Sequence, residues 1–265
     1  MLQLLHTKAL HCERLFYCLL LVSLVQPGFA KAEILCPASH IDRQAQVKYV
    51  HDGDTLHLAS GEKIRLIGIN TPELGRDGRP AEPLAYAARD RLREIIKQTG
   101  HSVGLRFDRD RKDRYGRTLA HLYDARGHSL SAQLLKDGLA NLLAVPPNLD
   151  GLRCYARQES HARAQRHGIW RHNPVIDSLR LTSSTQGYQH IKGRITRIGE
   201  GRRNLWLNLP GGVALRIDKK DLEHFPGLKP RQLAGKTVIG RGWLYTRKGE
   251  RRMRIRSAYA LEILP

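Results

Sequence analysis

Three short segments carry side chains that could together hydrolyse a phosphodiester bond. Asp54 and Asn70 offer side-chain oxygen atoms, Thr71 offers its backbone carbonyl, and hard cations such as Ca²⁺ prefer oxygen ligands. Glu73 follows in the same stretch, and its carboxylate could accept a proton from a water molecule beside such a cation. The sequence therefore predicts cation ligands and a general base close together.

Two arginines complete this set. Arg65 and Arg117 carry forked guanidinium groups, which can hold phosphate oxygens and stabilise the charge that builds up during in-line attack. In a strand, Arg65 would point away from its apolar neighbours Ile64 and Leu66. We expect Gly116 to let the loop that carries Arg117 approach the substrate closely.

Short β-prone segments must position these residues. The sequence predicts strands over residues 45–50, 55–58, 63–69, 103–107 and 118–123, and helices over residues 80–96, 129–136 and 151–167. Five short strands with a helix after the third indicate a mainly β protein with helices. The expected fold is a five-stranded Greek-key barrel of the OB type.

Composition changes after Pro174. Residues 33–174 read as a first domain, 175–186 as a linker and 187–265 as a second domain. The second domain has 18 Lys and Arg against 6 Asp and Glu, and it contributes +12 to the chain's net charge of +20. Such an excess predicts a polyanionic partner, either nucleic acid or an anionic surface, unless it serves solubility alone.

The second domain has a β pattern of its own. Strands are expected over residues 191–198, 204–209, 213–217, 237–245 and 253–256, with Asp218 as the N-cap of a short helix over 219–225. This order again indicates a small OB-like barrel. Trp206, Trp243 and Tyr245 lie on its basic strands, where they either fill the interior or stack on nucleic-acid bases.

The first residues have the pattern of a secretory signal peptide. Lys8 and Arg14 precede an apolar run over residues 15–25, and small residues allow cleavage after Ala30 or Ala32. We expect residues 1–32 to be removed and the protein to be secreted or periplasmic. An uncleaved N-terminal anchor is the alternative.

Export would leave two cysteines, Cys36 and Cys154, in the mature chain. In an oxidising compartment two such residues most simply form a disulfide bond. Two unpaired thiols are the other possibility.

The order and spacing of these motifs resemble the staphylococcal nuclease (thermonuclease) family from about residue 45 to residue 170. The matching segments are Asp52-Gly53-Asp54-Thr55, Ile64-Arg65-Leu66, Thr71-Pro72-Glu73, Asp113-Arg114-Tyr115-Gly116-Arg117, Gly138-Leu139-Ala140 and Gly168-Ile169-Trp170. The resemblance implies a Ca²⁺-dependent phosphodiesterase that acts on DNA and RNA and leaves 3′-phosphate ends.

The resemblance also implies a role for each matched position. Asp54 would bind the metal with Asn70 and Thr71, Glu73 would be the general base or orient the water, and Arg65 and Arg117 would hold the phosphate. In the loop that begins at Asp113, the positions of Arg114 and Tyr115 help to hold the substrate's terminal phosphate and sugar.

Two positions depart from the family pattern. Asn70 stands where the family has a second metal-binding aspartate, so one negative charge is lost and Ca²⁺ binding should weaken. Ala144 stands where the family has a tyrosine that contacts the nucleotide. The alternatives to a nuclease are a non-catalytic nucleic-acid-binding protein on the same fold and a basic envelope-surface module.

Overall fold

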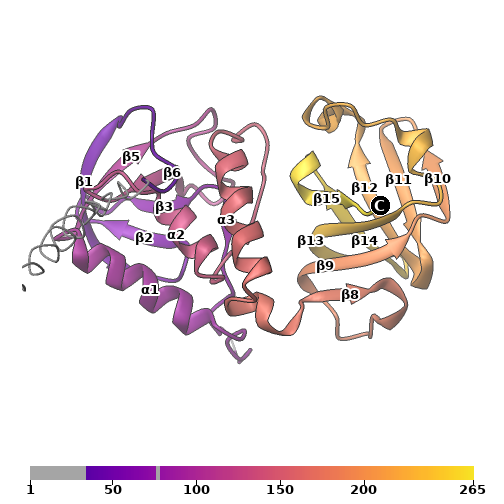
Figure 1. The fold of residues 1–265 in the computed structure, drawn as a ribbon, viewed down its shortest axis with the longest axis horizontal. Helices are drawn as coiled ribbons and strands as arrows, with labels where there is room; N and C mark the ends of the chain where they lie inside the picture. Colours follow the sequence, from indigo (N-terminus) through magenta and orange to yellow (C-terminus); the bar gives the residue numbers. More distant parts are fainter. Residues whose placement is uncertain (1–33, 76–77) are drawn as a thin grey trace, which may run out of the picture. The chain divides into compact units, whose positions relative to one another are not determined.

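The computed structural model describes residues 34–75 and 78–265, and the expected signal peptide lies outside the described residues. The first region is a closed five-stranded barrel (Figure 1). Its strands follow the order β1 (Arg43–Val50), β2 (Thr55–Leu58), β3 (Lys63–Leu66), β6 (Thr118–Tyr123) and β5 (Ser102–Arg106). Strands β3 and β6 are parallel, and the other pairs are antiparallel. The predicted OB-type barrel is confirmed.

Three helices accompany the barrel: α1 (Ala85–Gln98), α2 (Leu130–Lys136) and α3 (Leu152–Ala164). Helix α2 begins as predicted, because the side chain of Ser129 accepts a hydrogen bond from the backbone N–H of Ala132. Helix α1 begins later than the predicted residue 80. Its first flanking residue, Leu84, has φ of 69°, a left-handed conformation that a continuous helix does not contain.

The predicted strand over residues 63–69 is broken in two. After β3 the chain turns at Gly68, where φ is 86° and an added Cβ would lie 2.5 Å from the ring of Tyr155. Strand β4 (Ile69–Asn70) then pairs with β7 (Asn141–Leu142) rather than with the barrel. This turn places Asn70 and Thr71 beside the end of β1.

Cys36 and Cys154 form a disulfide bond, the pairing expected from the sequence. The bond joins the segment before β1 to helix α3, and both cysteines pack on the apolar core of the barrel. The loop that it closes contains every predicted site residue of the first region.

The second region is a single sheet built from the remaining strands. They are β8 (Val175–Asp177), β9 (Gly187–Arg194), β10 (Arg197–Glu200), β11 (Asn204–Leu209), β12 (Val213–Asp218), β13 (Thr237–Arg247), β14 (Glu250–Ile255) and β15 (Leu261–Ile263). The strands run in the order β10-β11-β12-β14-β13-β9-β8, and β15 pairs with β13. Residues 175–177, predicted to lie in a linker, instead form β8, because they pair with β9.

The order within this sheet repeats that of the barrel. Strands β9 and β10 are separated only by Ile195 and Thr196, whose N–H groups donate to Lys236 and Asn208 on the two sides. Strands β12 and β14 are parallel, like β3 and β6. This sheet has its own apolar core, and an OB-like barrel for residues 187–265 is consistent with this order.

The short helix predicted over residues 219–225 is present as a 3₁₀ helix over Lys219–His224, with Asp218 at its N-cap position. The predicted side-chain cap is wrong, because Asp218 makes no capping hydrogen bond. The Asp218 carboxylate is held by two arginines, Arg216 at 2.9 Å and Arg254 at 2.7 Å. These ion pairs take the oxygens that a cap would use.

Buried polar contacts join the two regions. Arg241 of β13 donates to Glu159 of α3, and the two residues are 7% and 3% exposed. The other carboxylate oxygen of Glu159 accepts from Leu142 N at 2.7 Å.

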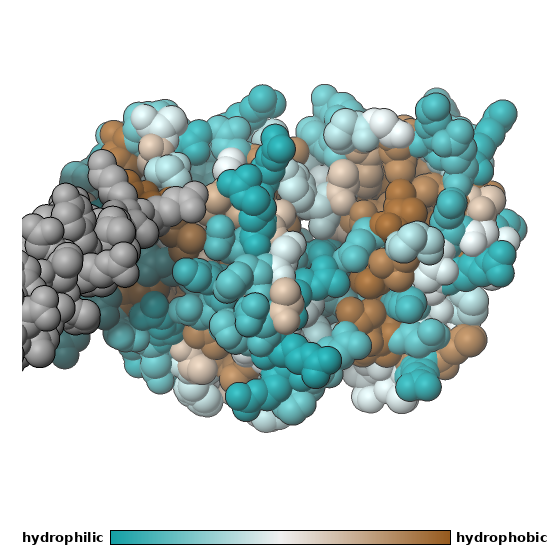
Figure 2. Space-filling model, viewed as in Figure 1, coloured by the Kyte–Doolittle hydropathy of each residue, from teal (hydrophilic) through white to brown (hydrophobic). Residues whose placement is uncertain are grey.

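Hydrophilic side chains cover most of the molecular face that is drawn in Figure 2. In the described part of the chain, no helix is long and apolar enough to cross a membrane.

Candidate active site

A cavity of about 730 Å³ contains most of the residues that the sequence singled out. From the first region it is lined by Asp54, Arg65, Asn70, Glu73, Asp113, Arg114, Tyr115 and Arg117. Thr71 lies at the edge of this cavity, where its backbone N–H donates a hydrogen bond to Asp54. The structure thus brings together side chains that lie far apart in the sequence.

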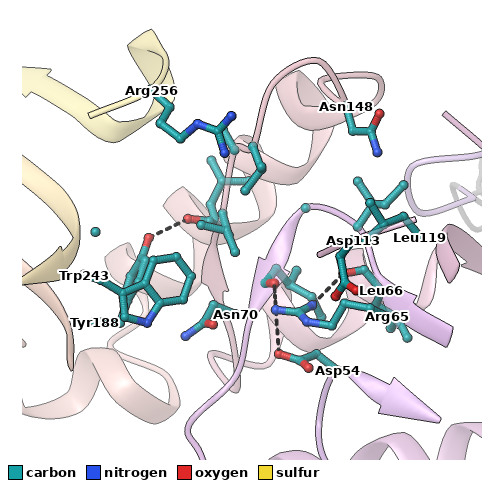
Figure 3. Close-up of a pocket in the computed structure, with 18 of the residues that line it drawn as sticks. Asp54, Arg65, Leu66, Asn70, Asp113, Leu119, Asn148, Tyr188, Trp243 and Arg256 are labelled. Atoms are coloured by element: carbon teal, nitrogen blue, oxygen red, sulfur yellow. Dashed lines mark hydrogen bonds and ion pairs between the residues drawn. The ribbon is translucent and has the colours of Figure 1, made fainter. Parts of the chain in front are cut away.

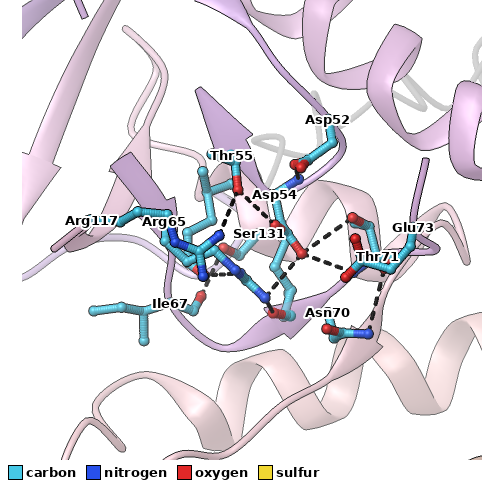
Figure 4. A network of polar contacts seen from close by, with 12 residues as sticks. Asp52, Asp54, Thr55, Arg65, Ile67, Asn70, Thr71, Glu73, Arg117 and Ser131 are labelled. Atoms are coloured by element: carbon cyan, nitrogen blue, oxygen red, sulfur yellow. Dashed lines mark hydrogen bonds and ion pairs between the residues drawn. The ribbon is translucent and has the colours of Figure 1, made fainter. Parts of the chain in front are cut away.

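Asp54 is the centre of the polar network in Figure 4. Its Oδ2 accepts from the Thr71 backbone N–H at 3.1 Å and the Thr71 hydroxyl at 3.2 Å, and it lies 3.0 Å from Nη2 of Arg65. Its Oδ1 accepts from the Thr55 hydroxyl at 3.0 Å. Because Asp54 is only 5% exposed, these donors hold its carboxylate in one orientation.

Gly53 lets this network form. A Cβ at Gly53 would lie 2.7 Å from the methyl group of Thr71 and 2.8 Å from Ala88 of helix α1. Any larger residue would push the turn between β1 and β2 away from Thr71. The Asp-Gly-Asp motif is therefore required by packing as well as by charge.

Arg65 is held from both sides. Besides Asp54, its guanidinium donates to the carbonyls of Leu66 at 2.6 Å and Ile69 at 2.9 Å. These hydrogen bonds fix the guanidinium group at the end of β3, where the turn to β4 begins. Only 11% of its side chain is exposed.

Arg117 is fixed by its own loop. Its Nε donates to Asp113 at 2.7 Å and its Nη1 to the Thr55 hydroxyl at 3.3 Å. Asp113 also accepts from the backbone N–H groups of Arg117 and Tyr115, and these bonds lower the pKa of Asp113 against the opposing effect of burial. Among the described residues, Nη2 of Arg117 has no acceptor and stays available to a ligand.

Gly116 is required by the turn that carries Arg117. Nothing lies within 4 Å of the position that its Cβ would take. Its φ of 78° and the hydrogen bond from its N–H to the Asp113 carbonyl show that it serves the turn. The expected close approach of this loop to the substrate stays a prediction.

Tyr115 and Arg114 lie at the open side of the cavity. Tyr115 is 68% exposed, and Arg114 and Arg117 lie over its ring at 4.7 and 5.5 Å. An exposed ring between two cations is suited to a ligand that carries both a planar group and negative charge.

Carboxylates crowd the inner end of the cavity. The pKa of Glu73 is raised, first by partial burial and then by the charges of Asp54, Asp52 and Glu82. The pKa of Asp52 is raised by burial and by Asp54. Sequence reasoning did not single out Asp52, although its place two residues before Asp54 was a usable signal. The crowding leaves an excess of negative charge for a cation to balance.

The oxygen atoms at this end suit a hard cation. Among residues 34–75 and 78–265, no group of three or more His, Cys, Asp or Glu is arranged to hold a metal ion. The predicted set is different: the Asp54 carboxylate, the Asn70 amide oxygen and the Thr71 carbonyl. The Asn70 amide nitrogen lies 3.4 Å from the Thr71 carbonyl, and a half-turn of the amide would place its oxygen there instead. The donor chemistry therefore fits Ca²⁺.

A closed OB barrel with paired arginines and carboxylates at one end defines a class of protein, and comparisons with known proteins identify it. Residues 63–172 match the family described as "Staphylococcal nuclease homologue". The thermonuclease of Staphylococcus intermedius is 36% identical over 128 residues, which cover 47% of this chain and 74% of that protein. The thermonuclease of Staphylococcus hyicus is 32% identical over 124 residues, covering 46% and 72%.

A prophage-derived endonuclease of Bacillus subtilis is 32% identical over 130 residues, covering 47% of this chain and 43% of that protein. The chain belongs to the staphylococcal nuclease family. The family match ends at residue 172, so it does not include the second sheet.

Proposed function

We propose that this protein is an exported, Ca²⁺-dependent nuclease that hydrolyses the phosphodiester bonds of DNA and RNA and leaves 3′-phosphate ends. The observation that carries the proposal is the convergence of Asp54, Arg65, Glu73 and Arg117 on one cavity. Relatives named as thermonucleases and as an endonuclease support it.

Each residue has a task in this proposal. Arg65 and Arg117 donate to the phosphate oxygens and stabilise the charge that grows on them as water attacks phosphorus. Glu73, whose pKa is raised, takes a proton from the attacking water, and the bond from phosphorus to the 5′ oxygen breaks. Arg114, Tyr115 and Asp113 position the substrate.

A Ca²⁺ ion would be held by Asp54, Asn70 and the Thr71 carbonyl, and it would supply positive charge beside the phosphate. The loss of one carboxylate at Asn70 makes this site weaker than one with two aspartates.

Export is supported by two observations. The N-terminal pattern of Lys8, Arg14 and the apolar run over 15–25 is that of a signal peptide. The disulfide between Cys36 and Cys154 is suited to an oxidising compartment, periplasmic or extracellular.

We divide the mature chain into a nuclease domain over residues 33–174 and a basic, OB-like domain over 187–265. The second domain would hold nucleic acid, because its net charge of +12 attracts phosphates.

A second function, binding without cleavage, is favoured by one observation. Nη2 of Arg65 lies 3.0 Å from Asp54, so a guanidinium competes with a cation for this carboxylate. A protein in which Arg65 keeps that place would bind nucleic acid and leave it intact.

Digestion of single- and double-stranded DNA and of RNA, with Ca²⁺ or with a chelator, decides between the two functions. We expect cleavage with Ca²⁺ only. The Glu73→Gln variant should lose rate and keep substrate binding, because only the proton acceptor is removed. Full activity in chelator would overturn the Ca²⁺ dependence, and no cleavage under any condition would favour binding alone.

A further inference from the structure

The wall of the cavity that faces Asp54 and Arg65 comes from the second sheet. Trp243 and Tyr245 of β13 and Arg256, just after β14, line the same cavity. Figure 3 shows Trp243 across the pocket from Asp54, with Asn70 between them. The site of the barrel is thus one side of a two-sided cleft.

This wall is firmly anchored. Arg241, Trp243 and Tyr245 occupy alternate positions of β13, so they share one face of the sheet. Arg241 is tied to Glu159 of helix α3 in a buried ion pair. Because that pair fixes the strand against the first region, the next two side chains on the same face are held toward the cavity.

Trp243 presents a supported aromatic surface. It is 48% exposed although it lies in the middle of a sheet, so of the two alternatives that the sequence left open, a place in the interior is excluded for Trp243. Its ring packs nearly perpendicular to that of Tyr188, with centroids 5.1 Å apart. The Tyr188 hydroxyl in turn donates to the Leu142 carbonyl at 3.0 Å. A rigid, half-exposed indole of this kind is a platform on which a base can stack.

Arg256 supplies a positive charge on the same wall. Its Nη2 donates to the Pro146 carbonyl at 3.1 Å, and in the described part of the chain it forms no ion pair with a carboxylate. Its neighbour Arg254 pairs with Asp218 and Asp221, at 2.7 and 2.8 Å. Partial burial and the charge of Arg254 lower the pKa of Arg256 against the opposing charges of Asp221, Asp218 and Asp110, so an anion in direct contact with it would be stabilising.

We propose that Trp243 and Arg256 form a second substrate subsite, which binds a single-stranded polynucleotide across the cleft from Arg65 and Arg117. An unpaired base stacks on Trp243, and a neighbouring phosphate contacts Arg256. A base inside a duplex is paired and already stacked, so duplex DNA must open locally to use this subsite. The inference rests on the proposed nuclease function for its substrate, but its binding test does not.

The first test measures binding of a fluorescein-labelled, single-stranded oligonucleotide by anisotropy, in chelator so that it stays intact. The Trp243→Leu variant should bind about 5- to 150-fold more weakly, as expected for the loss of one base–aromatic stack. Trp243→Phe should recover much of the affinity. Tyr86→Leu is the matched control, because Tyr86 is an exposed aromatic residue of α1 that lies outside the cavity, and it should change nothing.

The second test concerns charge. Arg256→Gln should lower the slope of log affinity against log salt by about 0.7, the value for one phosphate contact on a single strand. Arg126→Gln removes the same charge from an exposed loop position of the first region that does not line the cavity, and it should leave the slope unchanged. Thermal unfolding of each variant shows that it is folded. If Trp243→Leu does not fold, Arg256→Gln still decides.

Cleavage assays separate the two proposals. In a protein that cuts DNA, we expect Trp243→Leu to raise KM for single-stranded substrate more than for duplex. Unchanged binding and KM in both Trp243→Leu and Arg256→Gln would overturn the subsite and leave the nuclease standing. An equal loss in Tyr86→Leu would overturn it as well. If the protein cuts no nucleic acid but both Trp243→Leu and Arg256→Gln weaken binding, the subsite is supported and the nuclease function is overturned.

Discussion

The two sheets of this protein follow the same strand order, but their corresponding turns carry side chains of opposite charge. In the barrel, the turn between the first two strands is Asp52-Gly53-Asp54, and its carboxylates meet arginines in the cavity. In the second sheet, the turn between β10 and β11 is Gly201-Arg202-Arg203, which is exposed and basic. The aspartates that the second sheet does have, such as Asp218, are used to neutralise arginines.

The difference shows that this fold sets positions and that the side chains at a few turns decide the chemistry. A turn that ends in Asp54 can hold a cation, and a turn of arginines can hold only anions. In the proposed function, the second sheet would therefore bind nucleic acid and the first would cut it. Four predictions test how far the two sheets differ and depend on each other.

The largest effect is expected where the sheets meet. Arg241→Leu leaves the buried carboxylate of Glu159 without its partner, so it should lower the free energy of unfolding by about 3–5 kcal/mol. Urea denaturation measures this loss. Adding Glu159→Gln, which keeps an acceptor for Leu142 N, should restore part of it. Arg252→Leu, which breaks the more exposed pair with Glu250, should have an effect of about 1 kcal/mol or less. An equally small effect for Arg241→Leu would mean that the two sheets are stable independently.

The next effect distinguishes the catalytic arginines from the binding ones. Arg65→Ala and Arg117→Ala should each lower kcat/KM by about 10²-fold or more, because each removes a donor to the charge of the transition state. Steady-state kinetics on plasmid DNA measures the loss. The matched change Arg197→Ala in the second sheet should leave the rate essentially unchanged. Full activity in Arg65→Ala would contradict the assignment of catalysis to the barrel.

Acid should weaken the contact between the sheets through His190 of β9. Burial, together with the charges of Arg241 and Arg163, lowers the pKa of His190 to about 3. The folded protein keeps this ring neutral while the unfolded chain protonates it below pH 6.5, so stability is full above that pH and falls toward pH 3. Between pH 7.5 and 5 the loss should be about 2 kcal/mol. Urea midpoints at both pH values should show a smaller loss for His190→Gln, and an identical loss would exclude His190 as the cause.

The smallest effect concerns the cation. Asn70→Asp adds one negative charge to the expected Ca²⁺ site, and one unit charge about 4 Å from a doubly charged ion contributes about 2 kcal/mol in water, which salt at physiological concentration reduces to about 1 kcal/mol. The Ca²⁺ concentration for half-maximal cleavage should therefore fall about fivefold. A titration of rate against Ca²⁺ checks this value. An unchanged midpoint would show that Asn70 does not face the cation.

Local signals in the sequence predicted much of the fold. Ser129 marked the start of α2, and the strand predicted over residues 118–123 matches β6. The break in the strand over 63–69 was not predicted, because the contact between Gly68 and Tyr155 joins residues distant in sequence. Strand β8 was missed for a similar reason, since three residues carry little pattern and depend on pairing with β9.

Local motifs also explain which residues of the site could be predicted from the sequence. Asp54, Arg65, Glu73 and Arg117 stand in motifs with recognisable spacing, and the structure brings them to one cavity. The opposite wall was not foreseen. Trp243 was noted as a possible stacking residue, but its place across from Asp54 depends on the packing of two regions, which no local pattern encodes.

The disulfide has a consequence for proteolysis. Cys36 and Cys154 close a covalent loop with a sequence separation of 118, and Asp54, Glu73 and Arg117 all lie within it. A protease that cuts the backbone once anywhere inside this loop opens the chain without releasing a fragment. The nicked protein would migrate as a single species on a gel until the bond is reduced. Outside the cell, where proteases are common, both pieces of the barrel would then stay tethered and able to reassociate.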